Sequence, residues 1–409
     1  MMSGREKAPT LGQGIVILLP LACYPVIDFV FRIANGIVAP DLSAEFSLDA
    51  ADLGLVSSVF FISFGLAQLP LGVALDRFGP KATMITLLAT AICGALTFIH
   101  ADTMGGLIAG RILLGIGMSA SLIAGIKTAT LWLPGRLPMA TSILVGATGI
   151  GGMIATVPFA EVLEQVPWRD AFLGLTAAIG ILIAATFLLV PATKTNHQTG
   201  IGEQFVSFGH VFRSSGLWRY APITMTCVGV GSAYQTLWAP LWLRDVAGYG
   251  PGEIAWVMLA MLGIYALGNL AFGWIAQTLK RRGKETMPVI FLATILFILC
   301  QVMLSLQIVS LATPLWIVAS LVLSGAYALY PLVTENFPAE YAARASSALN
   351  FLVFLSVFAI QWLTGLIIGS FPETAQGTFV PDAYSWAMAA GIGLQLAAIA
   401  WYFLSGRRR

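Results

Sequence analysis

The sequence predicts an all-α membrane protein with twelve transmembrane helices in two six-helix bundles and with both termini in the cytoplasm. Of its 409 residues, 58% are hydrophobic and 10% are charged, against roughly 45–50% and 25% in ordinary soluble domains. Apolar runs of membrane-crossing length recur along the chain, and one long polar segment divides them into two equal sets. This composition excludes a water-soluble globule and a disordered chain, and four cysteines, all within apolar runs, are too few for a secreted disulfide scaffold.

Each expected helix is an apolar run of about 20 residues, the length that crosses the hydrocarbon core of a bilayer. The runs are continuous and rich in Leu, Ala, Ile and Gly, whereas the strands of a membrane barrel would alternate apolar and polar residues. The first run continues past the length of a signal-peptide core, so we expect a retained helix. The predicted spans are residues 14–39, 53–75, 82–99, 105–133, 139–160, 169–190, 220–243, 254–279, 287–309, 314–336, 345–370 and 384–405.

Basic residues orient the chain by the positive-inside rule. With both termini in the cytoplasm, sixteen of the 21 Lys and Arg residues fall on the cytoplasmic side, and only Arg169 and Arg244 fall outside. The longest polar connection, residues 191–219, predicts a cytoplasmic linker between an N-terminal bundle, residues 1–190, and a C-terminal bundle, residues 220–409. A shift of about 200 residues aligns Gly72 with Gly273, a weak internal repeat. Two repeated bundles are a transporter architecture with its substrate site at the membrane midplane.

Two opposite charges lie inside the first predicted span. Asp28 and Arg32 are four residues apart and therefore share one helical face. An arginine near mid-membrane costs from about 2.5 kcal/mol upward, so it faces a watery cavity or a partner, and its guanidinium fork can bind a carboxylate or phosphate at two points. Asp28 is the candidate proton carrier, because an anion on Arg32 would withdraw the positive charge that favours an ionised Asp28. The alternative is a static ion pair.

Other polar side chains inside the spans are further candidates for the substrate site. Tyr234, Gln235 and Trp238 share roughly one face before the helix-breaking Pro240, and the repeat places Gln235 opposite the region of Arg32. Helix packing or an interfacial aromatic belt is the alternative for each residue. The remaining candidates are Gln68, Tyr327, Tyr330, Asn350 and Gln361. Lys127, near the cytoplasmic end of the fourth span, could snorkel to the interface, form a second cationic substrate contact or form a salt-bridge latch.

A family resemblance begins directly after the second span, which reads Gly72-Val73-Ala74-Leu75-Asp76-Arg77-Phe78-Gly79-Pro80-Lys81. This stretch resembles the loop signature of the major facilitator superfamily. The resemblance implies a conformational latch formed by Gly72, Asp76, Arg77, Gly79 and Lys81. Physically, Gly79 permits a tight reversal, and Asp76 can face the positive N-terminal end of a cytoplasmic helix beginning near Ser346, which would stabilise an outward-facing state. The second half keeps a degenerate copy, in which Gln277 replaces the aspartate.

The fourth and first spans extend the resemblance. Arg111, followed by Gly115 and Gly117, is similar to the arginine and glycine pattern of the family, which implies a role in proton coupling; structural pairing with a neighbouring helix is the alternative. The first span loosely resembles the anion/cation symporter branch, which implies that Arg32 binds anionic substrates. The partner arginine of that branch is missing from the seventh span.

These observations predict a secondary active transporter that works by alternating access and takes up a small organic anion, such as a carboxylate, together with protons. We expect a multi-pass protein of the bacterial inner membrane that acts as a monomer. The alternatives are a proton-driven exporter of amphipathic compounds and a membrane sensor on a transporter scaffold. No phosphate-binding loop, histidine cluster or nucleophile elbow occurs in the sequence, so we expect no enzyme activity, cofactor or metal. The net charge of +2 argues against nucleic-acid binding.

Overall fold

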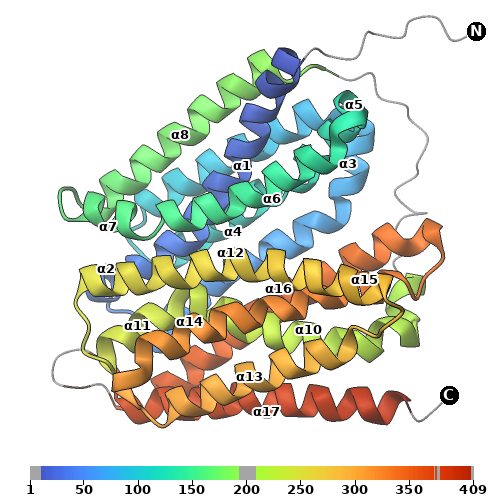
Figure 1. Ribbon diagram of the computed structural model, residues 1–409. Helices are drawn as coiled ribbons and strands as arrows, with labels where there is room; N and C mark the ends of the chain where they lie inside the picture. Colours follow the sequence, from blue (N-terminus) through green and yellow to red (C-terminus); the bar gives the residue numbers. More distant parts are fainter. Residues whose placement is uncertain (1–10, 193–208, 373, 375–377, 407–409) are drawn as a thin grey trace, which may run out of the picture.

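A computed structural model describes residues 11–192, 209–372, 374 and 378–406 of the protein. Within these residues the secondary-structure elements are all helical, and ten helices are long and apolar enough to cross a membrane. Figure 1 shows the first half of the chain, coloured blue to green, above the second half, coloured yellow to red. The expected class of helical membrane protein is therefore confirmed.

The N-terminal half contains eight α-helices and a single 3-10 turn, η1 (Pro134–Arg136). Its helices are α1 (Leu11–Ile37), α2 (Ala39–Phe46), α3 (Ala50–Ile99), α4 (Met104–Met118), α5 (Ile123–Trp132), α6 (Leu137–Ile154), α7 (Val157–Leu163) and α8 (Trp168–Leu189). Capping side chains define two of the starts, because Asp49 accepts a hydrogen bond from the backbone N–H of Asp52 and Thr103 accepts one from that of Gly106.

The C-terminal half contains longer single helices and more irregular turns. Its α-helices are α10 (Ser215–Ala233), α11 (Ala239–Asp245), α12 (Pro251–Arg281), α13 (Met287–Ser305), α14 (Ala312–Leu323), α15 (Leu329–Thr334), α16 (Ala339–Gly369) and α17 (Pro381–Gly406). The turns are the π-helical η2 (Tyr234–Trp238) and the 3-10 segments η3 (Val309–Leu311) and η4 (Ser324–Ala328). The helix α10 begins inside the predicted linker; linker residues 193–208 lie outside the described part of the chain.

The helix α3 contains two predicted spans, 53–75 and 82–99, separated by a sharp break at Gly79. The backbone of Gly79 has φ 78° and ψ 160°, a conformation that side-chain-bearing residues rarely adopt. The predicted tight reversal at this glycine is therefore present. The helix α16 begins at Ala339, before the predicted start at residue 345.

Two long helical segments are interrupted at corresponding places in the two halves. In the first half α4 ends at Met118 and α5 begins at Ile123; in the second half η4 separates α14 from α15. Ser119 bonds back to the carbonyl of Ile116 (2.7 Å), and Ser324 donates to the carbonyl of Tyr265 (3.0 Å). Interrupted helices at membrane depth free backbone groups and are where transporters build binding sites.

The two halves meet backbone to backbone at one end of the molecule. A Cβ atom on Gly36, near the end of α1, would collide with the backbone carbonyl of Thr236, and one on Gly365 would collide with the carbonyl of Ala50. Figure 1 shows α1 beginning and α17 ending at the opposite end, where the helices of the two halves diverge toward α5 and α15. The glycines therefore permit close packing of the halves at the end away from Leu11 and Gly406.

Candidate functional site

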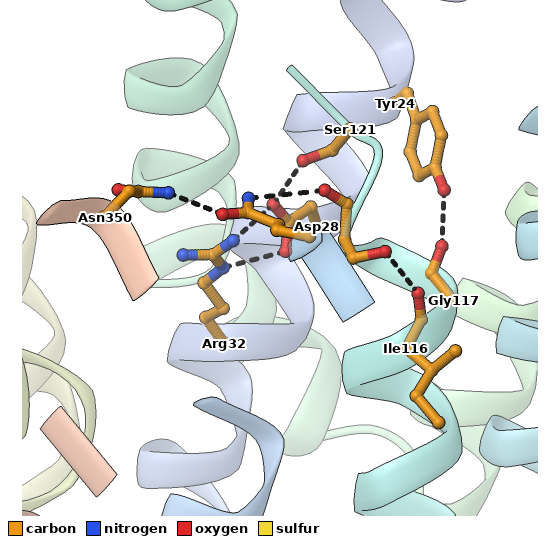
Figure 2. A network of polar contacts seen from close by, with 9 residues as sticks. Tyr24, Asp28, Arg32, Ile116, Gly117, Ser121 and Asn350 are labelled. Atoms are coloured by element: carbon orange, nitrogen blue, oxygen red, sulfur yellow. Dashed lines mark hydrogen bonds and ion pairs between the residues drawn. The ribbon is translucent and has the colours of Figure 1, made fainter. Parts of the chain in front are cut away.

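The predicted pair Asp28 and Arg32 forms a two-point ion pair in the middle of α1. Arg32 Nε donates to Asp28 Oδ1 at 2.8 Å, and Arg32 Nη2 donates to Asp28 Oδ2 at 2.7 Å. Asp28 is 1% exposed and Arg32 is 9% exposed. Figure 2 shows the two side chains lying along the same face of the helix, as their spacing predicts.

Asp28 has a second hydrogen-bond donor, which sequence reasoning missed. Ser121 lies in the interruption between α4 and α5, and its hydroxyl donates to Asp28 Oδ2 at 2.7 Å (Figure 2). The interruption allows this contact because Ser121 stands outside the regular helix and is 2% exposed. The available signal was the sequence Ser119-Ala120-Ser121, two hydroxyl residues within an apolar span.

Aromatic rings surround the guanidinium group of Arg32. Its Cζ atom lies 4.3 Å from the ring centre of Phe64, 4.9 Å from that of Phe29 and 5.5 Å from that of Phe354. Such placements contribute about 0.5–2 kcal/mol each, more when desolvated. Phe354 comes from α16, so the cationic group of the first half is in contact with the second half.

Arg111 is a second buried cation with a different environment. It is 1% exposed, and its guanidinium donates to the backbone carbonyls of Phe31 in α1 (3.2 Å) and Ser57 in α3 (3.2 Å). Among the described residues no carboxylate lies within 4.0 Å of it. The ring of Phe60 lies between the two cations, 5.6 Å from Arg32 and 4.8 Å from Arg111. Arg111 thus joins three helices and leaves this interior with an excess of positive charge.

A chain of hydrogen bonds connects the two halves next to the ion pair. Asn350 of α16 donates to Gln68 Oε1 of α3 at 2.6 Å and accepts from the hydroxyl of Tyr330 at 3.1 Å. Gln68 in turn reaches the carbonyl of Ser119 at 3.4 Å. Tyr327 stacks on Tyr330, with ring centres 5.9 Å apart. The structure therefore brings Asn350 and Tyr327 to the interface that contains Arg32, as Figure 2 shows for Asn350.

The residues predicted from the seventh span lie elsewhere. Tyr234 packs on Trp316, with ring centres 5.4 Å apart, and Gln235 reaches the hydroxyl of Ser320 at 3.5 Å, both inside the C-terminal half. Trp238 is fully buried and donates to the carbonyl of Gln361 at 3.1 Å.

The structure thus does not place Gln235 opposite Arg32. The repeat register assumed a regular helix, whereas residues 234–238 form a π-helical turn. Such a turn holds more residues than an α-helical turn and rotates the following side chains to a different face.

In the loop motif, Asp76 pairs with Lys127. Lys127 Nζ lies 2.9 Å from Asp76 Oδ1, and the two side chains are 40% and 38% exposed. Of the three alternatives for Lys127, the structure therefore contains the salt bridge. The partner of Asp76 is this lysine of α5 rather than the N-terminal end of α16. Such a half-exposed pair contributes about 0–1 kcal/mol, which makes it easy to open.

The other motif residues have structural contacts. Lys81 donates to the carbonyl of Phe187 in α8 at 2.6 Å, and the exposed Arg77 lies over the ring of Phe78 at 5.4 Å. Gly72 is exposed on α3. In the second half Lys280 of α12 pairs with Glu335, just after α15, at 2.5 Å. This pair corresponds to Asp76 and Lys127 of the first half, but here the earlier residue is the base and the later one the acid.

The opposite end of the molecule has its own charged cluster. Glu45 of α2 forms an ion pair with Arg169 at the start of α8 and accepts a hydrogen bond from Trp168 Nε1 at 2.9 Å. Slight burial raises the pKa of Glu45, but the hydrogen bonds from Arg169 and Trp168 and the charge of Arg169 outweigh it and hold the pKa below its ordinary value. Arg169 also donates to the carbonyls of Ile99 and Ala101, which ties the α3–α4 connection to α8.

Ten apolar helices among the described residues enclose buried charged side chains, as expected for a membrane transport protein. The chain belongs to the Major Facilitator Superfamily, whose family profile matches residues 21–361. Known relatives are transporters, which agrees with the transporter class predicted from the sequence.

Three relatives and one solved structure illustrate the similarity. The chain is 30% identical to the uncharacterized transporter YybO of Bacillus subtilis over 40% of its own length and 37% of that protein. It is 23% identical to the probable anion transporter 6, chloroplastic, of Arabidopsis thaliana over 87% of its length and 74% of that protein. It is 22% identical to the hexuronate transporter of Escherichia coli K12 over 63% of each. The fold matches a bacterial homologue of the human lysosomal transporter Spinster, in an inward-facing and unoccupied conformation, with a TM-score of 0.77, 18% identity and 98% of both chains covered.

Proposed function

We propose that the protein is a secondary active transporter that takes up a small organic anion together with protons by alternating access. The observation that carries the proposal is the two-point ion pair of Asp28 and Arg32, buried where the two halves meet. It is accompanied by the buried cation Arg111, which has no carboxylate within 4.0 Å in the described part of the chain. The names of two relatives, a probable anion transporter and a hexuronate transporter, support an anionic cargo.

The geometry of the pair supplies a coupling mechanism. In this structure Asp28 occupies the side-on edge of the Arg32 guanidinium, its Nε and Nη2. A carboxylate that binds Arg32 on this edge displaces Asp28. The displaced Asp28, still buried, loses its counter-charge and takes up a proton. Anion and proton then occupy the site together, and their release restores the original pair.

The aromatic and hydrogen-bonding contacts of the site connect substrate binding to movement of the halves. Phe354 covers Arg32 from the second half, and Asn350 holds Gln68 of the first half. Both contacts join the two halves and would separate when the halves rock. A ligand bound to Arg32 therefore changes the free energy of the interface between the halves. Tyr327 and Tyr330 are positioned to contact the remainder of the substrate.

The same observations support a particular arrangement in the membrane. We infer twelve crossings, with the two arms of α3 counted separately and α10, η2 and α11 forming the seventh. Residues 1–190 and 220–409 form the two bundles, residues 191–219 link them, and both termini face the cytoplasm. Close packing at Gly36 and the Asp76–Lys127 pair fit a protein that is closed outside and open to the cytoplasm. We infer a monomer in a bacterial inner membrane.

Export of an amphipathic compound is the second candidate function. The rings around Arg32 and the stacked Tyr327 and Tyr330 favour it, because a cavity with aromatic walls also accepts an apolar or cationic ligand. Under this function transport would not require an anionic group on the cargo.

Purified protein in liposomes containing a pH dye tests the proposal. Glucuronate, galactonate, inorganic phosphate and tetraphenylphosphonium are added outside in turn. Acidification inside with a carboxylate, lost in Arg32→Gln and kept in the control Arg281→Gln on the exposed end of α12, supports anion and proton uptake. Full activity in Arg32→Gln would refute the anion site, and a response to tetraphenylphosphonium alone would favour the exporter.

A further inference from the structure

We propose that Ser121 is a positioning residue for proton coupling, whose hydroxyl orients Asp28 toward Arg32 and determines the pH at which Asp28 takes up a proton. The proposal deepens the proposed function and rests on its assignment of Asp28 as the proton carrier. Ser121 itself contacts neither the anion-binding fork of Arg32 nor the interface between the halves in any hydrogen bond of the described residues.

The first argument is the geometry of the Asp28 carboxylate. Its Oδ1 accepts one bond, from Arg32 Nε, whereas its Oδ2 accepts two, from Arg32 Nη2 at 2.7 Å and from Ser121 at 2.7 Å. The two donors come from different helical segments, so the carboxylate is held from α1 and from the α4–α5 interruption. Once an anion occupies Arg32, Ser121 is the donor that remains.

The second argument is that few charged or titratable groups face Asp28. From α1 these are Arg32 and Tyr24, whose hydroxyl is bonded to the carbonyl of Gly117. From α4, Arg111 lies against the ring of Phe60, which also contacts Arg32. From the α4–α5 interruption, Ser121 is the neutral donor. With Arg32 engaged by substrate, the Ser121 bond is the remaining direct stabilisation of an ionised Asp28.

The third argument concerns the chemistry of the hydroxyl. A serine hydroxyl donates to an ionised carboxylate and rotates to accept from a protonated one. It therefore keeps Asp28 in place in both states, but it stabilises the ionised state more, because hydrogen bonds to charged groups are the stronger ones. Removing it favours the protonated state and moves proton uptake to higher pH by about one unit.

A matched set of variants tests this role. Ser121→Ala removes the donor, Ser121→Cys keeps the shape with a weaker donor, and Ser119→Ala alters the same interruption without touching Asp28, since Ser119 bonds to Ile116. Two readouts are used. The first is the infrared signal of the protonated carboxyl of detergent-purified protein against pH, assigned by its loss in Asp28→Asn. The second is the pH profile of glucuronate uptake into liposomes.

We expect the midpoint of the infrared titration to rise by about one pH unit in Ser121→Ala, by less in Ser121→Cys and not at all in Ser119→Ala. The uptake profile should move in parallel. An unchanged midpoint in Ser121→Ala, or an equal change in Ser119→Ala, would overturn the proposal. Because the infrared readout needs no substrate, a displaced midpoint in a protein that transports no carboxylate would contradict the proposed anion uptake while still showing that Ser121 determines the pH at which Asp28 takes up a proton.

Discussion

Substitution of Gly36 by alanine should disfavour closure of the two halves at the end where they meet backbone to backbone, which we propose faces outward. A Cβ atom on Gly36 would collide with the backbone carbonyl of Thr236 and lie 3.3 Å from the Cα of Leu237. Backbone atoms move less easily than flexible side chains, so the closed state bears the cost of this overpacking, about 1–3 kcal/mol. Since about 1.4 kcal/mol changes an equilibrium tenfold, the closed state should lose between roughly five-fold and 150-fold in population relative to the outward-open state.

Chemical labelling measures this change. Leu53, 1% exposed, and Leu241 of the other half line one pocket at the end of the molecule where the halves meet, which we propose faces outward. In a variant whose native cysteines are replaced, Leu53→Cys should react slowly with an impermeant maleimide added outside, and markedly faster when Gly36→Ala is present. Gly180→Ala in α8 is the matched control, because no atom lies within 4 Å of its added Cβ. Equal labelling with and without Gly36→Ala would refute the reasoning, as would an equal increase with Gly180→Ala.

Three further outcomes are expected. Asp28→Asn should retain exchange of substrate across the membrane but lose its pH dependence, because amide nitrogen cannot carry the proton; unchanged pH dependence of uptake would contradict this. Asp76→Lys should slow transport, and the exchange Asp76→Lys with Lys127→Asp should recover most of it, since the pair is joined by a single 2.9 Å contact; no recovery would show that the ion pair is not what matters. Glu45→Gln should lower the thermal midpoint slightly at neutral pH, since an exposed pair contributes about 0–1 kcal/mol. Because the pKa of folded Glu45 lies below its ordinary value, this stabilisation is present above about pH 4 and is lost as the pH falls through the folded pKa, so the melting curves of the variant and the parent should converge in acid.

Local spacing in the sequence was sufficient to predict the ion pair. Asp28 and Arg32 lie one helical turn apart within a continuous apolar run, and any regular α-helix places them side by side. The helical membrane class and the superfamily were likewise predictable, because the hydrophobic composition and the loop motif from Gly72 to Lys81 do not depend on tertiary contacts. Gly79 could be placed in a reversal for the same reason.

Predictions that depended on alignment between distant segments did less well. Gln235 was placed opposite Arg32 by counting along an assumed regular helix, whereas residues 234–238 form a π-helical turn in which Gln235 bonds to Ser320 of its own half. Lys127 had three plausible roles, and only the structure shows its salt bridge with Asp76, because a flexible lysine pairs with whichever acid the fold brings within reach.

The sequence by itself determined that this protein is a helical membrane protein of a transporter superfamily and that one helix carries an acid and a base on the same face. Only the tertiary structure decided what surrounds that pair. Ser121 is 93 residues from Asp28, and Phe354 belongs to the other half of the chain. Periodicity reports which face of a helix is polar, but contacts between helices depend on where each helix is interrupted and how closely its glycines let the backbones approach.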